Sequence, residues 1–410
     1  MDKLLRSHAD TIVSASIKAV QPDDAVRRAL AGQHFPGRVL LVAAGKAAWK
    51  MAEVAYSCLG DQIDAGVVIT KYGHVMGSIA NFACYEAGHP IPDNNSFAAT
   101  RKAVEIVSEL SQEDTVLFLL SGGGSALFEI PLVSGEVLQD ITGQLLSCGA
   151  DIKEINTIRK RLSAVKGGRF AQQCVPAQVF SIVLSDILGD PLDMIASGPA
   201  VPDSSTCEQA IAIAEKYQLK LTDDVWTLLA RETPKKLNNV TTKITGSVRE
   251  LCAAAAQACV ELGYEPIILT DQLCCQAREA GSFLSSVLKT HAESRKKLAF
   301  IAGGETVVHL TGNGKGGRNQ ELALSAAVGI AGIPGAAVFS VGSDGTDGPT
   351  EAAGGYVDYE TLDELMVQDI DIFRVLQDND AYHGLEKAGG LIVTGPTGTN
   401  VNDVAVALRW

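Results

Sequence analysis

Gly303 to Gly348 read GGETVVHLTGNGKGGRNQELALSAAVGIAGIPGAAVFSVGSDGTDG, a stretch that sets its strong polar side chains beside glycine turns. Its apolar runs predict a helix over residues 320–328 and a strand over 336–341, the alternation typical of an α/β sheet. Lys315 and Arg318 open the helix, where backbone N–H groups favour an anion. Asp344 and Asp347 follow the strand, at the edge where open α/β sheets bind ligands. We therefore expect an anion site here, with carboxylates suited to Mg²⁺ or to a general base.

Length and composition place the rest of the chain around this stretch. A chain of 410 residues, 46% of them hydrophobic, suits two cores, and 40 glycines with 14 prolines indicate repeated strand-to-helix turns. The polar run Glu232–Thr242 is the predicted linker, so we expect domains over 1–237 and 238–410. The net charge of −14 argues against nucleic-acid binding, and an anionic substrate must therefore meet a local basic pocket.

The cysteines and apolar runs indicate the compartment. Nine cysteines without a CxxC spacing predict neither a disulfide framework nor a zinc site. Residues 1–19 lack the apolar core of a signal peptide, and no run reaches about 18 apolar residues. We expect a cytoplasmic protein that binds no membrane, and the sequence leaves open whether it forms a homo-oligomer.

The first half of the chain opens with two predicted helices over residues 1–32 and a buried strand over 38–43. Lys46 follows that strand and precedes a helix, where a positive charge is disfavoured unless it meets an anion. A lysine at a helix start is commonly a solvated residue, but its place at the sheet edge favours function. His74 follows the predicted strand over residues 65–70, and His89 lies in a Gly/Pro stretch before the next predicted helix; either could contact substrate or hold a turn through the backbone.

The apolar strand over residues 115–120 runs into a glycine-rich loop. Consecutive glycines let backbone N–H groups approach a phosphate or a carboxylate closely. No GxxxxGK[ST] spacing occurs in the chain, so this is not a Walker loop. The predicted anion-binding residues are Ser121, Gly122, Gly123, Gly124 and Ser125.

Two further stretches carry charge. Residues 156–169 read NTIRKRLSAVKGGR and contain basic residues but no acid. Part of this positive charge belongs to the solvent-exposed face of a predicted amphipathic helix, and Arg159 and Lys166 are candidates for the site. Asp186 and Asp190 follow the predicted strand 178–184 in a Gly/Pro turn. They could bind Mg²⁺, deprotonate an alcohol or merely cap the turn, and we favour function for Asp186.

Glycine loops, cations at turns and acids at strand ends are together the equipment of phosphoryl transfer, in which cations and Mg²⁺ neutralise phosphate charge. The main alternative is an NAD(P)H-dependent reductase, because Gly312–Gly317 satisfy GxGxxG. Against it, the next strand-end acid, Asp344, comes 27 residues after Gly317 rather than about 20. A non-enzymatic acid-binding protein would have little use for the paired acids.

Seven motifs in order resemble the class II glycerate kinases, the glycerate 2-kinase family whose C-terminal half is the MOFRL domain and whose members were often labelled hydroxypyruvate reductases. Glu351 stands where many relatives are expected to carry Asp. The motifs are AAGKAA from Ala43, SGGGSAL from Ser121, NTIRKRLSAVKGGR from Asn156, SDILGDPLDMIASGP from Ser185, GGET and GKGGRNQE from Gly303, SDGTDGPTEAAGG from Ser343 and GPTGTN from Gly395.

The resemblance implies ATP- and Mg²⁺-dependent phosphorylation of D-glycerate at its 2-hydroxyl, giving 2-phosphoglycerate; hydroxypyruvate reduction with NAD(P)H is the alternative. It also implies a Rossmann-like N-terminal domain, a smaller C-terminal MOFRL domain with a mixed sheet, and a site in the cleft between them. Lys46, Asp186 and Arg318 then resemble the catalytic residues, and the Ser121–Ser125 loop faces the nucleotide. Asp190 is the expected metal ligand. The expected substrate contacts are Glu305, Lys315, Asn319, Asp344 and Asp347.

Overall fold

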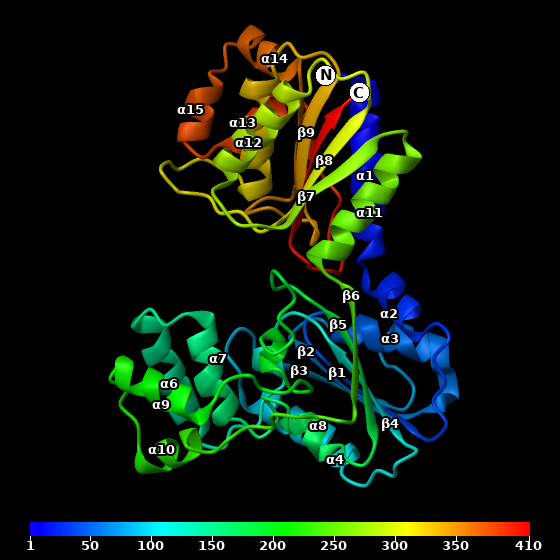
Figure 1. Cartoon of the computed structure of the whole chain (residues 1–410), viewed down its shortest axis with the longest axis vertical. Coiled ribbons are helices and arrows are strands. Elements are labelled where there is room, and N and C mark those ends of the chain that lie inside the picture. Colours follow the sequence, from blue (N-terminus) through cyan, green and yellow to red (C-terminus); the bar gives the residue numbers. More distant parts are fainter. The chain divides into compact units, whose positions relative to one another are not determined.

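The computed structural model describes all 410 residues and divides them into two compact units. Residues 25–245 form one unit; residues 1–24 and 246–410 form the other. Each unit contains a six-stranded sheet packed with helices, which confirms the expected pair of α/β domains (Figure 1). No helix is both long and apolar enough to span a bilayer.

The sheet of the 25–245 unit has the order β3-β2-β1-β4-β5-β6, and the pairs among its first five strands are parallel. The strands are β1 (Val39–Ala44), β2 (Ile63–Lys71), β3 (Phe82–Ala87), β4 (Thr115–Leu120), β5 (Gln178–Leu184) and β6 (Val240–Gly246). The helices are α2 (Pro22–Leu30), α3 (Ala48–Leu59), α4 (Asn94–Ile106), α5 (Gly124–Leu127), α6 (Gly135–Ser147), α7 (Ile152–Arg161), α8 (Arg169–Gln173), α9 (Cys207–Lys216) and α10 (Asp223–Leu229).

The apolar strands explain why helices cover both faces of this sheet. Alternate residues of β1 point into two different cores: Val42 and Ala44 into one, Leu41 and Ala43 into the other. Helices α6, α7, α9 and α10 enclose a separate small core. The strand order reverses between the neighbours β1 and β4, so the loops that follow these two strands lie at the point where doubly wound sheets bind ligands.

The other unit has the sheet order β11-β10-β9-β12-β8-β7, in which β7 and β8 are parallel and the remaining pairs antiparallel. This is the mixed sheet expected of the C-terminal domain. Its strands are β7 (Glu265–Leu273), β8 (Leu298–Gly304), β9 (Ala336–Gly342), β10 (Gly354–Asp358), β11 (Leu391–Ile392) and β12 (Asp403–Arg409). Its helices are α1 (Lys3–Ala19), α11 (Val248–Glu261), α12 (Ala277–Thr290), α13 (Arg318–Ile330), α14 (Thr361–Val367), α15 (Ile372–Gln377) and α16 (Ala381–Lys387).

The predicted boundary at 237/238 differs from the units of the structure in two ways. First, α1 belongs with the C-terminal residues, because it packs on α11 and buries Leu5 and Ile12. His8 Nδ1 lies 2.9 Å from the Tyr264 hydroxyl, which adds a polar contact to this packing. The apolar face of α1 could have packed on either sheet, so the sequence alone did not reveal its partner.

Second, the expected linker Glu232–Thr242 is not a linker. Thr233 donates its hydroxyl to buried Asp203 at 2.7 Å, and the Asn239 amide donates to the Ala171 and Ala177 carbonyls at 2.9 and 3.1 Å. The polar residues of this run therefore fasten it inside the 25–245 unit, and the chain leaves that unit after Thr245.

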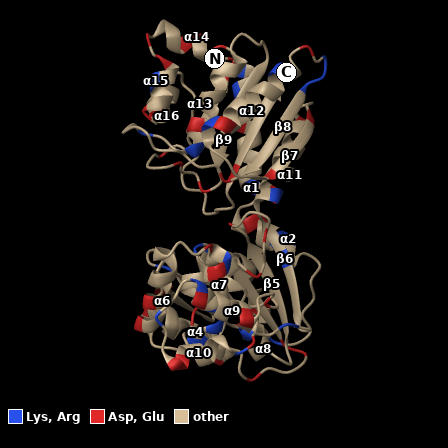
Figure 2. Cartoon of the chain, turned by 60° about the vertical axis from the view of Figure 1, so that its left-hand side comes forward, with Lys and Arg blue, Asp and Glu red and all other residues tan.

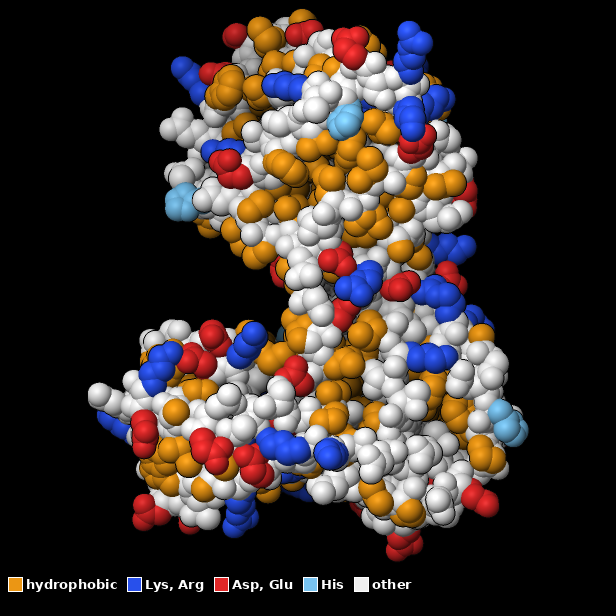
Figure 3. All heavy atoms as spheres, viewed as in Figure 1, with side chains coloured by type: hydrophobic (Ala, Val, Ile, Leu, Met, Phe, Trp, Pro, Cys, Tyr) orange, Lys and Arg blue, Asp and Glu red, His pale blue; other side chains and the backbone are white.

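Charged residues of both signs are interspersed over each unit (Figure 2). Apolar side chains gather on one face of the C-terminal unit (Figure 3), where edge strand β7 exposes Ile267, Ile268 and Leu269.

Candidate active site

The loops after β1 and β4 interlock at the switch point of the first sheet. The Lys46 N–H donates to the Gly122 carbonyl at 2.8 Å, and the Ala47 N–H donates to Ser121 Oγ at 3.0 Å. Gly45, at φ 131°, allows this approach, since a Cβ there would lie 2.2 Å from Ser121 Oγ. The structure thus brings Lys46 and the Ser121–Ser125 loop together, as neighbours 75 positions apart in the chain.

Close contacts of the glycine loop identify what surrounds it. A Cβ on Gly122 would lie 2.3 Å from Asp186 Oδ2, and a Cβ on Gly123 would lie 2.9 Å from the His89 ring and 3.3 Å from Lys46 Cγ. Asp186, His89 and Lys46 therefore crowd the loop. Burial lowers the pKa of His89, and the charges of Lys46 and Lys71 lower it further.

Of the two histidines, only His89 touches the glycine loop. His74 Nδ1 lies 3.1 Å from the Lys46 carbonyl oxygen, so His74 holds the turn that carries Lys46. This is the backbone role that the sequence left open.

The turn after β5, which brings Asp186 to the glycine loop, also carries Asp190. Asp190 has φ 51°, and its Oδ1 is buried with no hydrogen-bond partner. An orphaned carboxylate oxygen fits a hard cation such as Mg²⁺, which takes oxygen ligands. Asp190 and Asp186, on the same turn, are the residues that could hold such an ion.

Arg159 and Lys166 contact the last residue of the glycine loop, Ser125. Arg159 Nη2 and Lys166 Nζ donate to the Ser125 carbonyl at 3.0 and 2.9 Å. The sequence offered both as candidates, and the structure places them at the end of the loop, where they contact its backbone.

In the C-terminal unit, Arg318 stands at the start of α13. Its Nε and Nη2 donate to Asp403 Oδ2 and Oδ1 at 2.5 and 3.0 Å, and Nη1 donates to Glu305 at 3.0 Å. Glu305 follows β8 and Asp403 begins β12, which is antiparallel to β8, so both lie at one edge of the sheet. Arg318 has five N–H donors, and these bonds use three of them.

Asp403 is a residue that the sequence analysis missed. It begins a strand whose next five residues are all apolar and buried, and only the antiparallel pairing of β12 brings it beside Arg318, 85 positions earlier. Burial raises its pKa, while hydrogen bonds from Arg318 act in the opposite direction.

The N-terminus of α13 already holds an anion, the carboxylate of Asp347. Its oxygens accept the N–H groups of Asn319 and Gln320 at 3.2 and 2.9 Å, and the Asn319 amide at 3.3 Å. Burial raises the pKa of Asp347 to about 6. We expected the N–H groups at this helix end to bind an anion from outside the chain. That expectation is wrong for Asn319 and Gln320, because their N–H groups already donate to the Asp347 carboxylate.

The glycines before α13 serve close packing. The N–H groups of Gly312, Asn313, Gly314 and Lys315 all donate to Asp378, Asn379 or Asp380. A Cβ on Gly312 or Gly314 would lie within 2.7 Å of that turn. These N–H groups are therefore not directed at a ligand.

Two more predicted residues are engaged locally. Lys315 Nζ lies 3.4 Å from Glu351 Oε2 and 4.0 Å from the Tyr382 ring centroid. Asp344 Oδ1 accepts the Thr346 N–H and hydroxyl at 3.0 and 3.2 Å. Asp344 nevertheless lies near Asp403, the partner of Arg318. A Cβ placed on Gly342 would lie 3.4 Å from Asp344 Oδ1 and 3.4 Å from Asp403 Oδ1.

The GPTGTN loop from Gly395 packs on this turn. The Thr397 hydroxyl donates to the Ser343 carbonyl at 2.5 Å, and the Thr399 hydroxyl donates to the Val20 carbonyl at 2.8 Å. Both hydroxyls therefore hold the fold together.

Comparison with known proteins gives this arrangement a family. Residues 8–230 match the family model described as a domain of unknown function, DUF4147, and residues 298–403 match the MOFRL family. The D-glycerate 2-kinase of Thermotoga maritima is 53% identical, with 98% of both chains covered, and the glycerate 2-kinase of Pyrococcus horikoshii is 40% identical, with 97% of this chain and 96% of the relative covered.

Solved structures agree. The crystal structure of glycerate kinase from Thermotoga maritima superposes with a TM-score of 0.96 at 52% identity, with 100% of both chains covered. A relative from Agrobacterium vitis, 36% identical over 91% of this chain and 99% of its own, is provisionally named a hydroxypyruvate reductase. The chain belongs to the glycerate 2-kinase family in which a DUF4147 domain is joined to a MOFRL domain.

Proposed function

We propose that this chain is a glycerate 2-kinase, which transfers the γ-phosphoryl group of ATP to the 2-hydroxyl of D-glycerate and releases 2-phosphoglycerate and ADP. The observation that carries the proposal is the meeting of Lys46, Asp186 and the Ser121–Ser125 loop at the switch point of a Rossmann-like sheet. The full-length likeness to glycerate 2-kinases supports the choice of substrate.

In this proposal the glycine loop and Lys46 bind the phosphates of the nucleotide. Bare glycine backbone lets phosphate oxygens approach, and Lys46 adds a positive charge at the start of α3. Asp190 would hold Mg²⁺, which would supply charge neutralisation for the phosphates. The reaction forms a P–O bond to the 2-oxygen and breaks the bond to ADP, and the proton of the 2-hydroxyl passes to a carboxylate, for which Asp186 beside the loop is the candidate.

Arg318 binds an anionic group of the substrates through its two remaining N–H donors, and Glu305 and Asp344 lie beside it. Asn319 is 1% exposed and Asp347 is 3% exposed. We assign both a supporting role, which is to hold the helix that presents Arg318. Lys315, which precedes Arg318 in the loop before α13, contributes a further positive charge.

A reductase is the second candidate, and the structure of its supposed fingerprint argues against it. Dinucleotide-binding glycines leave their N–H groups for a pyrophosphate at a helix N-terminus. Here Gly312 and Gly314 donate to the Asp378–Asp380 turn, and Asp347 occupies the helix end.

One experiment separates the two functions. The protein is incubated with D-glycerate and Mg-ATP, and 2-phosphoglycerate is separated from 3-phosphoglycerate; a parallel sample receives hydroxypyruvate with NADH or NADPH. We expect ADP and 2-phosphoglycerate in the first sample and no cofactor oxidation in the second. Cofactor oxidation without ADP formation would overturn the kinase assignment, and 3-phosphoglycerate as the product would overturn the regiochemistry.

A further inference from the structure

The Ser121–Ser125 loop ends on a carbonyl that two cations share, Lys166 and Arg159, the second with a side chain that is 15% exposed. Lys166 is fully buried, and its Nζ donates to the carbonyls of Ser125 and Phe128 at 2.9 and 3.0 Å. Arg159 Nη2 donates to the same Ser125 carbonyl at 3.0 Å. Both lone pairs of the Ser125 carbonyl oxygen therefore accept hydrogen bonds from charged donors, which form the stronger kind of hydrogen bond.

One carboxylate accompanies these cations. Glu129 Oε2 lies 3.4 Å from Lys166 Nζ and 4.0 Å from Arg159 Nη2, and the Glu129 side chain is 0% exposed. Neither Glu129 oxygen accepts a hydrogen bond. Glu129, Arg159 and Lys166 thus form a cluster, called here the loop cluster, of two positive charges and one negative charge, with a net charge of +1.

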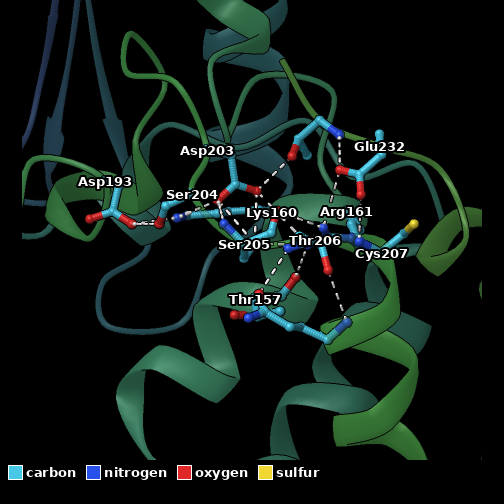
Figure 4. Close-up of polar contacts among 12 residues, drawn as sticks. Thr157, Lys160, Arg161, Asp193, Asp203, Ser204, Ser205, Thr206, Cys207 and Glu232 are labelled. Atoms are coloured by element: carbon cyan, nitrogen blue, oxygen red, sulfur yellow. Dashed lines mark hydrogen bonds and ion pairs between the residues drawn. The ribbon is translucent and has the colours of Figure 1, made fainter. Parts of the chain in front are cut away.

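A second cluster in the same unit, in which Lys160, Arg161 and Asp203 are buried and Lys235 and Glu232 are 40% and 41% exposed, shows a different balance. Lys160 lies 3.3 and 3.0 Å from Asp193 and Asp203, and Arg161 lies 3.8 and 3.7 Å from Asp203 and Glu232 (Figure 4). Lys235 Nζ lies 2.6 Å from Glu232. Three cations therefore meet three carboxylates, and this cluster is neutral as well as more richly hydrogen-bonded. The excess positive charge is therefore specific to the loop cluster and is not shared by the other cluster of charged side chains in this unit.

Burying a net charge is unfavourable unless an opposite charge compensates it. The loop cluster contacts the loop that carries Gly122, Gly123 and Gly124, and an anion at that loop would supply the compensation. The same contacts also fix the end of a loop whose three glycines give it high conformational freedom. Both effects favour the binding of an anion: the net positive charge attracts it, and the fixed end of the loop holds the loop in position to bind it.

We infer that Glu129, Arg159 and Lys166 are positioning residues for the nucleotide, and that the net positive charge of this buried cluster strengthens the binding of nucleotide phosphates at the Ser121–Ser125 loop without touching them. The inference rests on the proposed kinase function, in which this loop binds ATP. It assigns a role to buried residues that contact neither the phosphates nor the transferred group.

The protonation of Lys166 supports the inference. Burial lowers the pKa of Lys166 to about 8, against the raising effect of Glu129 and with a further lowering effect of Arg159. These two residues are the charged groups that face Lys166. Raising the pH from 7 to 9 removes the Lys166 proton and makes the loop cluster neutral, so the binding of nucleotide should weaken over this range.

The test follows the charge of the cluster through three variants: Lys166→Met, Glu129→Gln and the double variant. Their net charges are 0, +2 and +1. We expect Lys166→Met to raise KM for ATP about 10-fold, the scale of removing one unit charge several ångströms from a phosphate inside a protein. Glu129→Gln should lower KM for ATP, and the double variant should return it to within about threefold of the wild type.

Charge restoration separates this inference from a merely structural role. If the cluster only held the loop in place, removing two of its three members would impair binding at least as much as removing one. KM for ATP in the double variant at or above that of Lys166→Met would therefore overturn the inference. So would a rise in KM for glycerate alone, because the loop would then not face the nucleotide.

Arg161→Met is the matched control. Arg161 is as fully buried as Lys166 and also donates to backbone carbonyls, at Thr157 and Ser205, but it belongs to the neutral cluster of Figure 4. We expect lower thermal stability and an unchanged KM for ATP, and a comparable rise in KM here would overturn the inference. If Lys166→Met does not fold, Glu129→Gln and the double variant still test the order of KM values.

The pH profile gives an independent readout. KM for ATP of the wild type should rise between pH 7 and 9, and the double variant, whose remaining cation is an arginine, should show a smaller rise. Equal profiles would overturn the inference. Failure of the wild type to phosphorylate glycerate at any pH would instead overturn the proposed function, so the two failures are distinguishable.

Discussion

Arg318 and Asp403 form a two-point ion pair in which Nε and Nη2 of the guanidinium meet the two oxygens of one carboxylate. The pair fixes the plane of the guanidinium group, and Glu305 accepts a third N–H. Because α13 begins at Arg318 and β12 begins at Asp403, this contact ties a helix start to a strand start at one edge of the sheet. The remaining donors of Arg318 are thereby aimed before any substrate binds.

Arg318→Ala is expected to lower kcat/KM at least about 100-fold, since removing one preorganised charged donor costs roughly 3 kcal/mol in the transition state. Asp403→Asn should lower it less, about 10-fold, because the arginine remains but loses one of its two anchors. Steady-state kinetics with both substrates check the two values. Near-native activity of purified Arg318→Ala would remove Arg318 from the mechanism.

Lys46→Ala is also expected to lower kcat/KM at least about 100-fold, because Lys46 lies at the glycine loop, where the proposed reaction requires phosphate charge to be neutralised. The protein should still fold, since Lys46 occupies a turn and not a core. Lys50→Ala is the matched control: Lys50 lies one turn further along α3 and pairs with Glu53 at 2.9 Å. A loss of similar size in both variants would indicate damage to α3 and not to the site.

Gly122→Ala tests the closeness of the loop to Asp186. A Cβ would lie 2.3 Å from Asp186 Oδ2, so the carboxylate must move. We expect kcat to fall about 10-fold or more with a small change in thermal stability. Gly143→Ala on α6 is the control, because a Cβ there meets nothing within 4 Å and helical alanine is favourable. Unchanged kcat in Gly122→Ala would show that the position of Asp186 is not critical.

The fold and half of the site could be predicted from the sequence because their signals are local. Apolar runs and glycine turns indicate the order of strands and helices. A lysine or an aspartate that directly follows a predicted strand, such as Lys46 or Asp186, can be recognised as a candidate site residue from its position in the sequence. Asp403 could not be found in this way, since its importance comes from a partner 85 positions away.

The misread features share a cause with Asp403. The backbone N–H groups at the start of α13 were expected to favour an anion, but the N–H groups of Gly312 and Gly314 donate to Asn379 and Asp378, more than 60 positions later. Helix α1 joined the C-terminal unit for the same reason, because its partner surface on α11 is distant in the chain. Sequence patterns identify groups able to bind an anion, but only the folded chain shows which of these groups it has already used.

Metal dependence is predicted from Asp190. Its buried orphan oxygen should take a hard cation, so Asp190→Asn is expected to raise the Mg²⁺ concentration for half-maximal rate about 10-fold or more. Rates are measured against free Mg²⁺ at a fixed excess of ATP, and excess EDTA should abolish turnover. An unchanged Mg²⁺ dependence would assign the ion to other ligands, and turnover in EDTA would remove it from the mechanism.

Asp347 gives a prediction for stability against pH. Burial raises its pKa from 3.8 to about 6, so the folded chain holds this proton over a pH range in which the unfolded chain has released it. The linkage relation then requires the contribution of Asp347 to the free energy of unfolding to be fully present below pH 3.8 and to be lost as the pH rises through about 6.

Asp347→Asn keeps the size of the side chain and removes the titration. The free energy of unfolding of the wild type minus that of Asp347→Asn should therefore fall by up to about 3 kcal/mol between pH 4 and pH 7. Urea unfolding of both proteins at one-unit pH steps measures it, and the difference cancels the groups that titrate independently of Asp347. A difference that stays constant, or that grows with pH, would mean that the two helix N–H groups hold Asp347 ionised in the folded protein and that burial does not govern its proton.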